Sequence, residues 1–344
     1  SLHDALPIFS RDLKLVAPSF LGCLIFHVFP QHQETFAHIL RIVGVANFLD
    51  VIMGHPLKFF LHHQVCFITS RTEDGLPFRN AARYDPLFRS ILARAQTLFP
   101  VEILAFALEA NHLHMLLAPI NPEDVPAFVG YVKQELAHLA NYDSKRRKKT
   151  VWCDGYDSPL MREEQVIIYY MSYIYTQSRS LRNPLCNSFS MFSKGIHEVV
   201  VPRRNREGRE VKGDAHTLTL DPISWLRRLH PSSTDEELRT RLLTTIIKVR
   251  GEGVHLPFIS DFREQTEQEK LYVPTKHGRR LYGIFNDIGL RVEFLMFIKA
   301  ARAECRKALA EWRKGNYHYP WPAGFFPPHA IRRANAITYK DVTY

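Results

Sequence analysis

The chain has 344 residues, of which 46% are hydrophobic, and it carries a formal net charge of +10 at pH 7. This length and apolar content exclude a disordered chain and predict two domains, or one large domain with an extension. The five cysteines form no CxxC pair, which excludes a zinc ribbon or a disulfide framework and favours a reducing cytoplasm. The positive charge favours a polyanionic partner, because lysine and arginine neutralise phosphates; a basic protein without such a role is the alternative.

The N-terminal stretch leads to two expectations. The first methionine is Met53, and residues 1–8 are similar to a translated sequencing adapter, so we expect residues 1–52 to be a non-native or disordered extension. Residues 15–29 are the most membrane-like segment, but Pro18 and His27 interrupt it, and it is shorter than the ~20 apolar residues of a spanning helix. We therefore expect a cytoplasmic protein without a membrane partner.

Between residues 58 and 181, strand-like and helix-like patterns alternate. The expected elements are a strand over 58–70, a helix from Asp85-Pro86 to 99, strands over 101–108 and 112–118, a helix from 121, a strand and turn over 151–156, and a helix over 163–181. In the second helix the apolar positions share one face: Val125, Phe128, Val129, Val132, Leu136 and Leu139. This order predicts an α+β fold, with a ferredoxin-like antiparallel sheet and helices on one side.

Residues 191–344 are expected to form a basic, mainly helical C-terminal region of unknown role. Five cations between residues 203 and 212 predict a basic linker or hairpin, and helices are expected over 233–250 and 294–315. The tail after residue 316 is rich in aromatic residues and proline. We expect it to pack back onto the domain, with base stacking as the alternative.

The most informative stretch is Asn111-His112-Leu113-His114, inside the apolar run that ends at Pro119. Because a strand alternates its faces, His112 and His114 project from one face and Leu113 from the other. Two imidazoles on a stiff strand form half of a metal site, which needs further ligands from elsewhere. Two strand histidines with ordinary hydrogen-bond partners are the alternative.

The helix over 163–181 carries Tyr173 and Gln177, which lie one turn apart on one face. Beside a divalent metal, a tyrosine phenolate can attack a scissile phosphate in line and form a phosphotyrosine. The amide oxygen of Gln177 suits a hard cation such as Mg²⁺ or Mn²⁺ as a third ligand. A tyrosine-rich helix that merely packs on a sheet is the alternative, since Tyr169, Tyr170 and Tyr175 are its neighbours.

Over residues 58–187 the sequence resembles the HUH single-tyrosine transposases, in particular the branch associated with repetitive extragenic palindromes (REP). Three motifs carry this resemblance in the family's order: His112-Leu113-His114, the tryptophan-containing segment 151–158, and Tyr173 followed by Gln177. The chain departs from that branch after the tyrosine, because Asn183-Pro184 stands further downstream than the family's Asn-Pro.

The resemblance implies a catalytic domain over residues 53–190 with His112, His114 and Gln177 as metal ligands, Tyr173 as nucleophile and Mg²⁺ or Mn²⁺ as the cofactor. It also implies cleavage and religation of single-stranded DNA beside a hairpin through a 5′-phosphotyrosine. The protein would be bacterial and nucleoid-associated, and would act as a monomer or a homodimer. The extension after residue 190 lies outside this resemblance.

The cationic run Lys145, Arg146, Arg147, Lys148 and Lys149 is expected to contact DNA phosphates, with a solvated loop as the alternative. Two other functions stay open from the sequence. One is a non-catalytic DNA-binding protein derived from a transposase. The other is an unrelated metallohydrolase that uses zinc-bound water.

Overall fold

The computed structural model describes residues 58–78, 80–147, 149–153, 155–180, 186–251, 283–326 and 339–340. All of them belong to the second of two compact units into which the chain divides, Lys58–Tyr344. The expected N-terminal extension and Met53 lie outside the described residues. Among the described residues, no helix has both the length and the hydropathy needed to cross a lipid bilayer.

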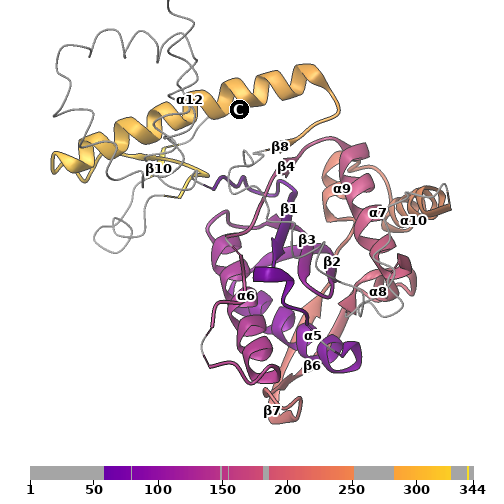
Figure 1. The fold of residues 1–344 in the computed structure, drawn as a ribbon. Coiled ribbons are helices and arrows are strands. Elements are labelled where there is room, and N and C mark those ends of the chain that lie inside the picture. Colours follow the sequence, from indigo (N-terminus) through magenta and orange to yellow (C-terminus); the bar gives the residue numbers. More distant parts are fainter. Residues whose placement is uncertain are drawn as a thin grey trace, which may run out of the picture. The chain divides into compact units, whose positions relative to one another are not determined.

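A six-stranded sheet with the order β5-β2-β3-β1-β4-β8 forms the centre of the fold (Figure 1). Its strands are β1 (Cys66–Arg71), β2 (Val101–Leu108), β3 (His112–Pro119), β4 (Leu160–Met161), β5 (Cys186–Asn187) and β8 (Gly283–Ile284). The inner order β2-β3-β1-β4 is antiparallel throughout, and only β8 joins in parallel, beside β4. The predicted α+β class and the ferredoxin-like antiparallel sheet are confirmed.

Helices α5 (Ala81–Leu98) and α6 (Asp124–Asp143) pack on each other and cover one face of the sheet. Facing residues of antiparallel strands project to the same side. Phe106 of β2 faces Met115 of β3 and touches Phe88 of α5, with ring centroids 5.7 Å apart. The buried residues of α6 are those predicted from its periodicity, with Ala140 added.

Two expectations from the sequence differ from the structure: the first residue of α5 and the bounds of the first strand. Helix α5 begins at Ala81, because Asn80 caps it by accepting a hydrogen bond from the Arg83 N–H, so that Pro86 lies inside the helix. The first strand was expected over residues 58–70, but β1 begins only at Cys66 and ends at Arg71.

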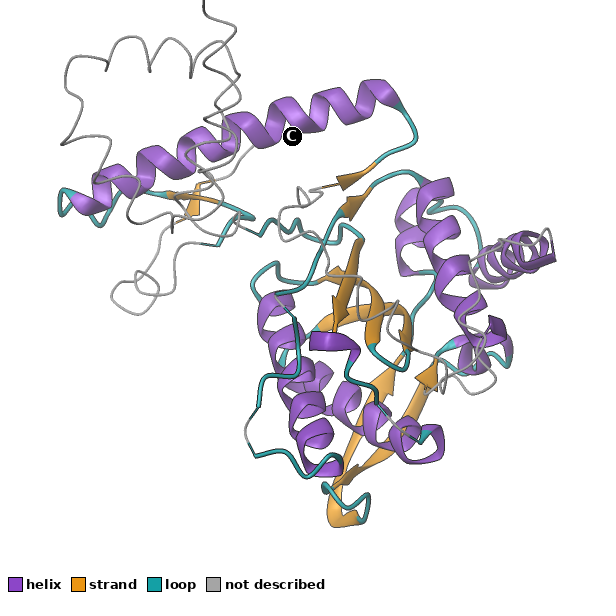
Figure 2. Ribbon diagram, in the orientation of Figure 1, coloured by secondary structure: helices purple, strands orange, loops and turns teal. Residues whose placement is uncertain are grey.

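Helix α7 (Glu164–Ser180) covers the opposite face of the sheet, so the helices lie on both sides and not on one (Figure 2). Phe67 of β1 faces Leu116 of β3 and touches Tyr170 and Tyr173 of α7. Leu116 shares its strand face with His114, since the two lie two positions apart along the strand. Sequence periodicity shows that a helix packs on the sheet but does not identify the face.

The C-terminal region is mainly helical, as predicted, and also contains a hairpin. Strands β6 (Glu198–Arg204) and β7 (Glu210–Thr219) form this hairpin, which packs on α5. The other elements are the helices α8 (Phe189–Ser193), α9 (Ser224–Leu229), α10 (Asp235–Gly251) and α12 (Ile288–Arg313), and the short strands β9 (Trp321–Pro322) and β10 (Tyr339–Lys340).

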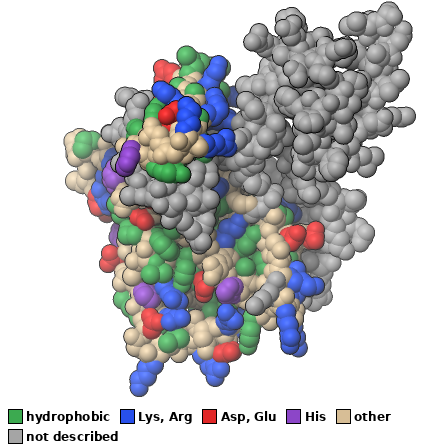
Figure 3. Space-filling model, turned by 90° about the vertical axis from the view of Figure 1, so that its left-hand side faces the viewer, with side chains coloured by type: hydrophobic (Ala, Val, Ile, Leu, Met, Phe, Trp, Pro, Cys, Tyr) green, Lys and Arg blue, Asp and Glu red, His purple; other side chains and the backbone are tan. Residues whose placement is uncertain are grey.

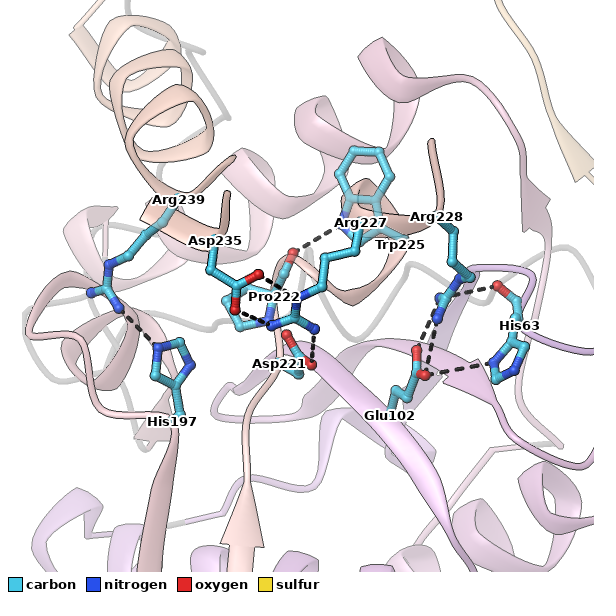
Figure 4. Close-up of polar contacts among 10 residues, drawn as sticks. All are labelled: His63, Glu102, His197, Asp221, Pro222, Trp225, Arg227, Arg228, Asp235 and Arg239. Atoms are coloured by element: carbon cyan, nitrogen blue, oxygen red, sulfur yellow. Dashed lines mark hydrogen bonds and ion pairs between the residues drawn. The ribbon is translucent and has the colours of Figure 1, made fainter. Parts of the chain in front are cut away.

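Polar contacts attach α9 and α10 to the region of the sheet around Glu102 (Figure 4). Arg228 of α9 binds both carboxylate oxygens of Glu102, at 3.0 and 2.9 Å. Its neighbour Arg227 joins Asp221 and Asp235, each at 2.7 Å. These ion pairs are partly exposed, so they fix orientation more than they add stability.

The aromatic tail packs back on the protein, as predicted. Phe59 touches Phe325 of the tail, with ring centroids 4.5 Å apart, and Phe297 of α12, at 5.5 Å. Trp321 is 1% exposed and contacts Trp312 of α12 with ring centroids 5.5 Å apart and planes tilted by 45°.

Candidate active site

His112 and His114 project from the face of β3 that α7 covers. Their ring centroids are 4.7 Å apart. Leu113 between them is fully buried on the other face. The strand alternation inferred from the sequence therefore holds, and both imidazoles lie between the sheet and α7.

Tyr173 is the tyrosine that α7 brings to this pair. Its ring centroid lies 5.4 Å from that of His114, in an edge-to-face arrangement. Phe67 of β1 stacks on the His114 ring, at 5.3 Å with planes 13° apart, and also contacts Tyr173 in an edge-to-face arrangement at 6.4 Å. The three rings, which come from β3, β1 and α7, therefore all contact one another.

The neighbouring tyrosines have other surroundings. Tyr175 is fully buried, and its hydroxyl donates a hydrogen bond to the carbonyl oxygen of Leu104 at 3.4 Å. Tyr169 is 48% exposed and makes a ring contact with Tyr170. Burial raises the pKa of Tyr170, which leans against Phe67.

Both histidines are neutral at physiological pH. Burial, together with the nearby Arg71 guanidinium, lowers the pKa of His112 to about 4. Burial and the neighbouring His112 hold the pKa of His114 well below its ordinary value. A metal ion binds the neutral form of imidazole, so this environment keeps both rings in the ligating state.

The surroundings of the ring nitrogens also suit a metal. Nδ1 of His112 lies 2.9 Å from Oδ1 of the buried Asn111, an acceptor that fixes the proton on Nδ1 and leaves the lone pair on Nε2. His114 is 6% exposed, and neither of its ring nitrogens has a hydrogen-bond partner among the described residues. Buried nitrogens of this kind are costly unless a ligand satisfies them.

Within the described ranges, no group of three or more acidic, histidine or cysteine side chains could hold a metal ion. Gln177, the predicted amide ligand, belongs to α7 one turn beyond Tyr173. Its side chain lies outside the described residues, so its role stays a prediction. The two histidines and Tyr173 are the part of the predicted set that the structure brings together.

The cationic run follows α6 in a loop. Lys145, Arg147 and Lys149 are exposed, and Arg146 donates to the carbonyl oxygen of Thr150 at 3.3 Å, while Lys148 lies outside the described residues. The loop leads into Trp152, which pairs with Thr72 immediately after β1. Arg71, the last residue of β1, faces His112. The loop that carries the cationic run therefore meets the sheet at the end where His112 lies.

Sequence reasoning missed Glu109, which directly precedes the β2–β3 turn. Its N–H donates to the carbonyl oxygen of His112 at 2.9 Å. The side chain is fully buried, and its two carboxylate oxygens have no partner among the described residues. Burial raises the pKa of this carboxyl to about 8. The signal in the sequence was an acidic residue that directly follows the apolar run 103–108.

Comparison with known proteins supports the resemblance inferred from the motifs. Residues 78–177 match the family model of IS200-like transposases. This match covers less than a third of the chain, and it contains both histidines, Tyr173 and the cationic run. No curated protein matches the chain in sequence.

A solved structure, described as the REP-associated tyrosine transposase bound to a REP hairpin, matches 42% of this chain and 88% of that chain. Its identity is 15% and its TM-score 0.33, values too low to inform function. The comparison therefore rests on the family match alone. It confirms that residues 78–177 are similar to the IS200-like transposases, as the histidine and tyrosine motifs predicted.

Proposed function

We propose that the protein cleaves and religates single-stranded DNA, beside a hairpin or palindromic repeat, through a covalent 5′-phosphotyrosine on Tyr173. The observation that carries this proposal is the position of the Tyr173 ring, 5.4 Å from a buried His114 whose two nitrogens lack partners among the described residues. The match to IS200-like transposases supports DNA as the substrate. A cytoplasmic, nucleoid-associated monomer or homodimer is part of the same proposal.

His112 and His114 would hold a divalent cation, Mg²⁺ or Mn²⁺, with the Gln177 amide as a third ligand. When bound, the cation polarises the scissile phosphate and stabilises the charge that develops on it. Asn111 orients the His112 ring, and Phe67 restrains the His114 ring by stacking. These contacts restrict the rotation of both imidazoles before DNA arrives, so less ordering remains to be done on binding.

The proposed chemical step is a transesterification. The oxygen of Tyr173 forms a bond to phosphorus while the bond from phosphorus to the 3′ oxygen of the preceding nucleotide breaks. The phenolic proton leaves to solvent, and the departing 3′ oxygen takes up a proton. One ester is exchanged for another, so the reverse step by a new 3′ hydroxyl rejoins the DNA and releases the tyrosine without an external energy source.

The test is incubation of the purified protein with end-labelled single-stranded DNA that contains a hairpin from the surroundings of its gene, with and without Mn²⁺. We expect a covalent protein–DNA band on a denaturing gel that requires the metal and is absent in Tyr173→Phe. Tyr169→Phe is the matched control, since Tyr169 lies on the same helix, is half exposed and has its ring against Tyr170 and not against the histidines. It should leave the band unchanged.

A band that persists in Tyr173→Phe would move the nucleophile to another tyrosine. Tight binding of the DNA by wild type without any covalent band would contradict the enzymatic proposal and favour a non-catalytic DNA-binding protein. Metal-dependent hydrolysis that leaves no DNA on the protein would point to a water-based metallohydrolase.

A further inference from the structure

The cationic loop after α6 lies beside the tip of the β6–β7 hairpin, although more than fifty residues separate them in sequence. Arg206 at the tip places its Nη2 3.1 Å from Nδ1 of His138 on α6. Arg83, near the start of α5, donates to the carbonyl oxygens of Arg206 and Glu207, the latter at 3.1 Å, and forms an ion pair with Asp143 at 2.9 Å. The tip is therefore fixed to the ends of both helices.

The loop is fastened at the same place. The N–H of Arg146 donates to the carbonyl oxygen of Asn141 at 2.8 Å, and the Asn141 side-chain amide donates to the carbonyl oxygen of Lys149 at 2.8 Å. Loop and hairpin together expose five cations that form no ion pair with a described residue, and we name them the basic edge: Lys145, Arg147, Lys149, Arg206 and Lys212. Figure 3 shows lysine and arginine side chains standing out along the lower end of this side of the molecule.

The cations of the basic edge differ from the other arginines of the hairpin. Arg204 pairs with Glu210 at 2.6 Å, and Arg209 pairs with Glu207 at 2.9 Å. The five cations of the edge form no ion pair with any described residue. Their charge is thus available to an external anion, and it is presented on backbone that is already ordered.

The basic edge lies at the end of the sheet where His112 and His114 lie. Helix α5 precedes β2 and runs antiparallel to it, so α5 begins at that end. Helix α6 follows β3 and runs antiparallel to it, so α6 ends there. Trp152, three residues after Lys149, pairs with Thr72, and Arg71 faces His112. A nucleic acid whose scissile phosphate reaches His112 can therefore continue past Arg71 onto the basic edge.

We infer that the basic edge binds the sugar-phosphate backbone of duplex DNA, which would be the stem of the hairpin whose unpaired strand enters the active site. This inference rests on the proposed function for the choice of DNA. Duplex is favoured over single strand because neither residues 144–150 nor residues 205–213 include an aromatic side chain on which unpaired bases could stack. Tyr142, an exposed ring two residues before residue 144, already lies against the guanidinium of Arg83, at 5.9 Å.

The test compares the full-length protein with Arg206→Ala/Lys212→Ala, both in a Tyr173→Phe background that prevents cleavage. Fluorescence anisotropy is measured with a labelled hairpin that has a long stem, and with the unpaired strand alone, over a series of salt concentrations. We expect about tenfold weaker binding of the hairpin, with a salt slope smaller by about 2, because each duplex phosphate contact contributes about 0.9 to that slope. Binding of the unpaired strand should be nearly unchanged.

Lys194→Ala/Lys299→Ala is the matched control, since it removes the same charge from exposed positions outside the basic edge. Equal losses in this control and in the edge variant would overturn the inference, because net charge alone would then explain the effect. An equal loss for the unpaired strand would also overturn it. A second stem of unrelated sequence should give the same loss, since phosphate contacts do not read bases.

The two proposals can fail separately. A covalent band in wild type, with unchanged hairpin binding in the edge variant, would refute the basic edge and leave the chemistry intact. Absence of the band, with the expected loss of hairpin binding, would leave the edge and refute the catalytic role of Tyr173.

Discussion

Asn111 determines which nitrogen of His112 is available to a cation. Its Oδ1 lies 2.9 Å from Nδ1 of His112, and the residue is 4% exposed. Replacing it with leucine keeps the volume and removes the acceptor, so the imidazole is free to rotate and to change tautomer. Loss of a group that hydrogen-bonds to a metal-binding histidine typically lowers metal affinity by roughly 10- to 100-fold.

We therefore expect Asn111→Leu to weaken Mn²⁺ binding by at least about tenfold, as measured by isothermal titration calorimetry on DNA-free protein. The circular dichroism spectrum should not change. Asn111→Asp, which restores an acceptor at the same place, should recover most of the affinity. Equal affinity in wild type and in Asn111→Leu would mean that the hydrogen bond does not orient the ring.

Glu109 makes stability depend on pH. Burial raises the pKa of this carboxyl to about 8 from its ordinary value of 4.5. Between these two values the unfolded chain loses the proton while the folded chain keeps it. The contribution of the neutral carboxyl to stability is therefore fully present below pH 4.5 and decreases as the pH rises to about 8.

Glu109→Gln should abolish this dependence, because an amide does not titrate. We expect the Tm of the variant to equal or modestly exceed that of wild type at about pH 5 and to exceed it by several degrees at about pH 8. Differential scanning fluorimetry across this range measures the difference. A constant offset at all pH values would show that the carboxyl is ionised in the folded protein.

At the scale of elements, residues of the C-terminal region contact α7 and stabilise its position. The carboxylate of Glu164, in its first turn, accepts from Arg241 of α10 at 2.5 Å and lies 2.9 Å from Nε2 of His230. Helix α10 packs along α7. The helix that carries Tyr173 thus depends on residues far outside the segment similar to transposases.

Glu164→Gln and Arg241→Met should each lower the Tm by a few degrees, since partly buried pairs of this kind contribute about 1 kcal/mol. The double variant should lose less than the sum of the two, because both changes remove one interaction. Chemical denaturation of the four proteins completes the cycle. Additive losses would show that the pair is not coupled.

The individual helices and strands also show which features of the fold can be predicted from the sequence. The apolar period of α6 predicts every buried residue of that helix except Ala140, because a regular helix maps sequence spacing directly onto a face. The alternation around Leu113 likewise predicts that the two histidines share a face. The face covered by α7 was not predictable, because the connection before it places no constraint on its side of the sheet.

At the scale of the whole molecule, the features missed by sequence reasoning join distant segments. Strand β8 has two residues and pairs with β4 across more than a hundred positions, so no local pattern marks it. The same holds for Arg83, whose contacts with the hairpin tip span 123 and 124 residues. The candidate site was predicted to the extent that it depends on local motifs, namely His112, His114 and Tyr173.

The aromatic cluster around Phe59 has a consequence for the order of assembly. Phe59 leaves the ribosome among the first described residues, whereas its ring partners Phe294, Phe297 and Phe325 are among the last. Strands β1 to β3 and helices α5 to α7 pack on one another within one early stretch, although α5 and α7 also contact the later hairpin and α10, and early segments can fold first during synthesis. The histidines and Tyr173 can therefore come together on a nascent chain, whereas this cluster closes only after Phe325 has left the ribosome.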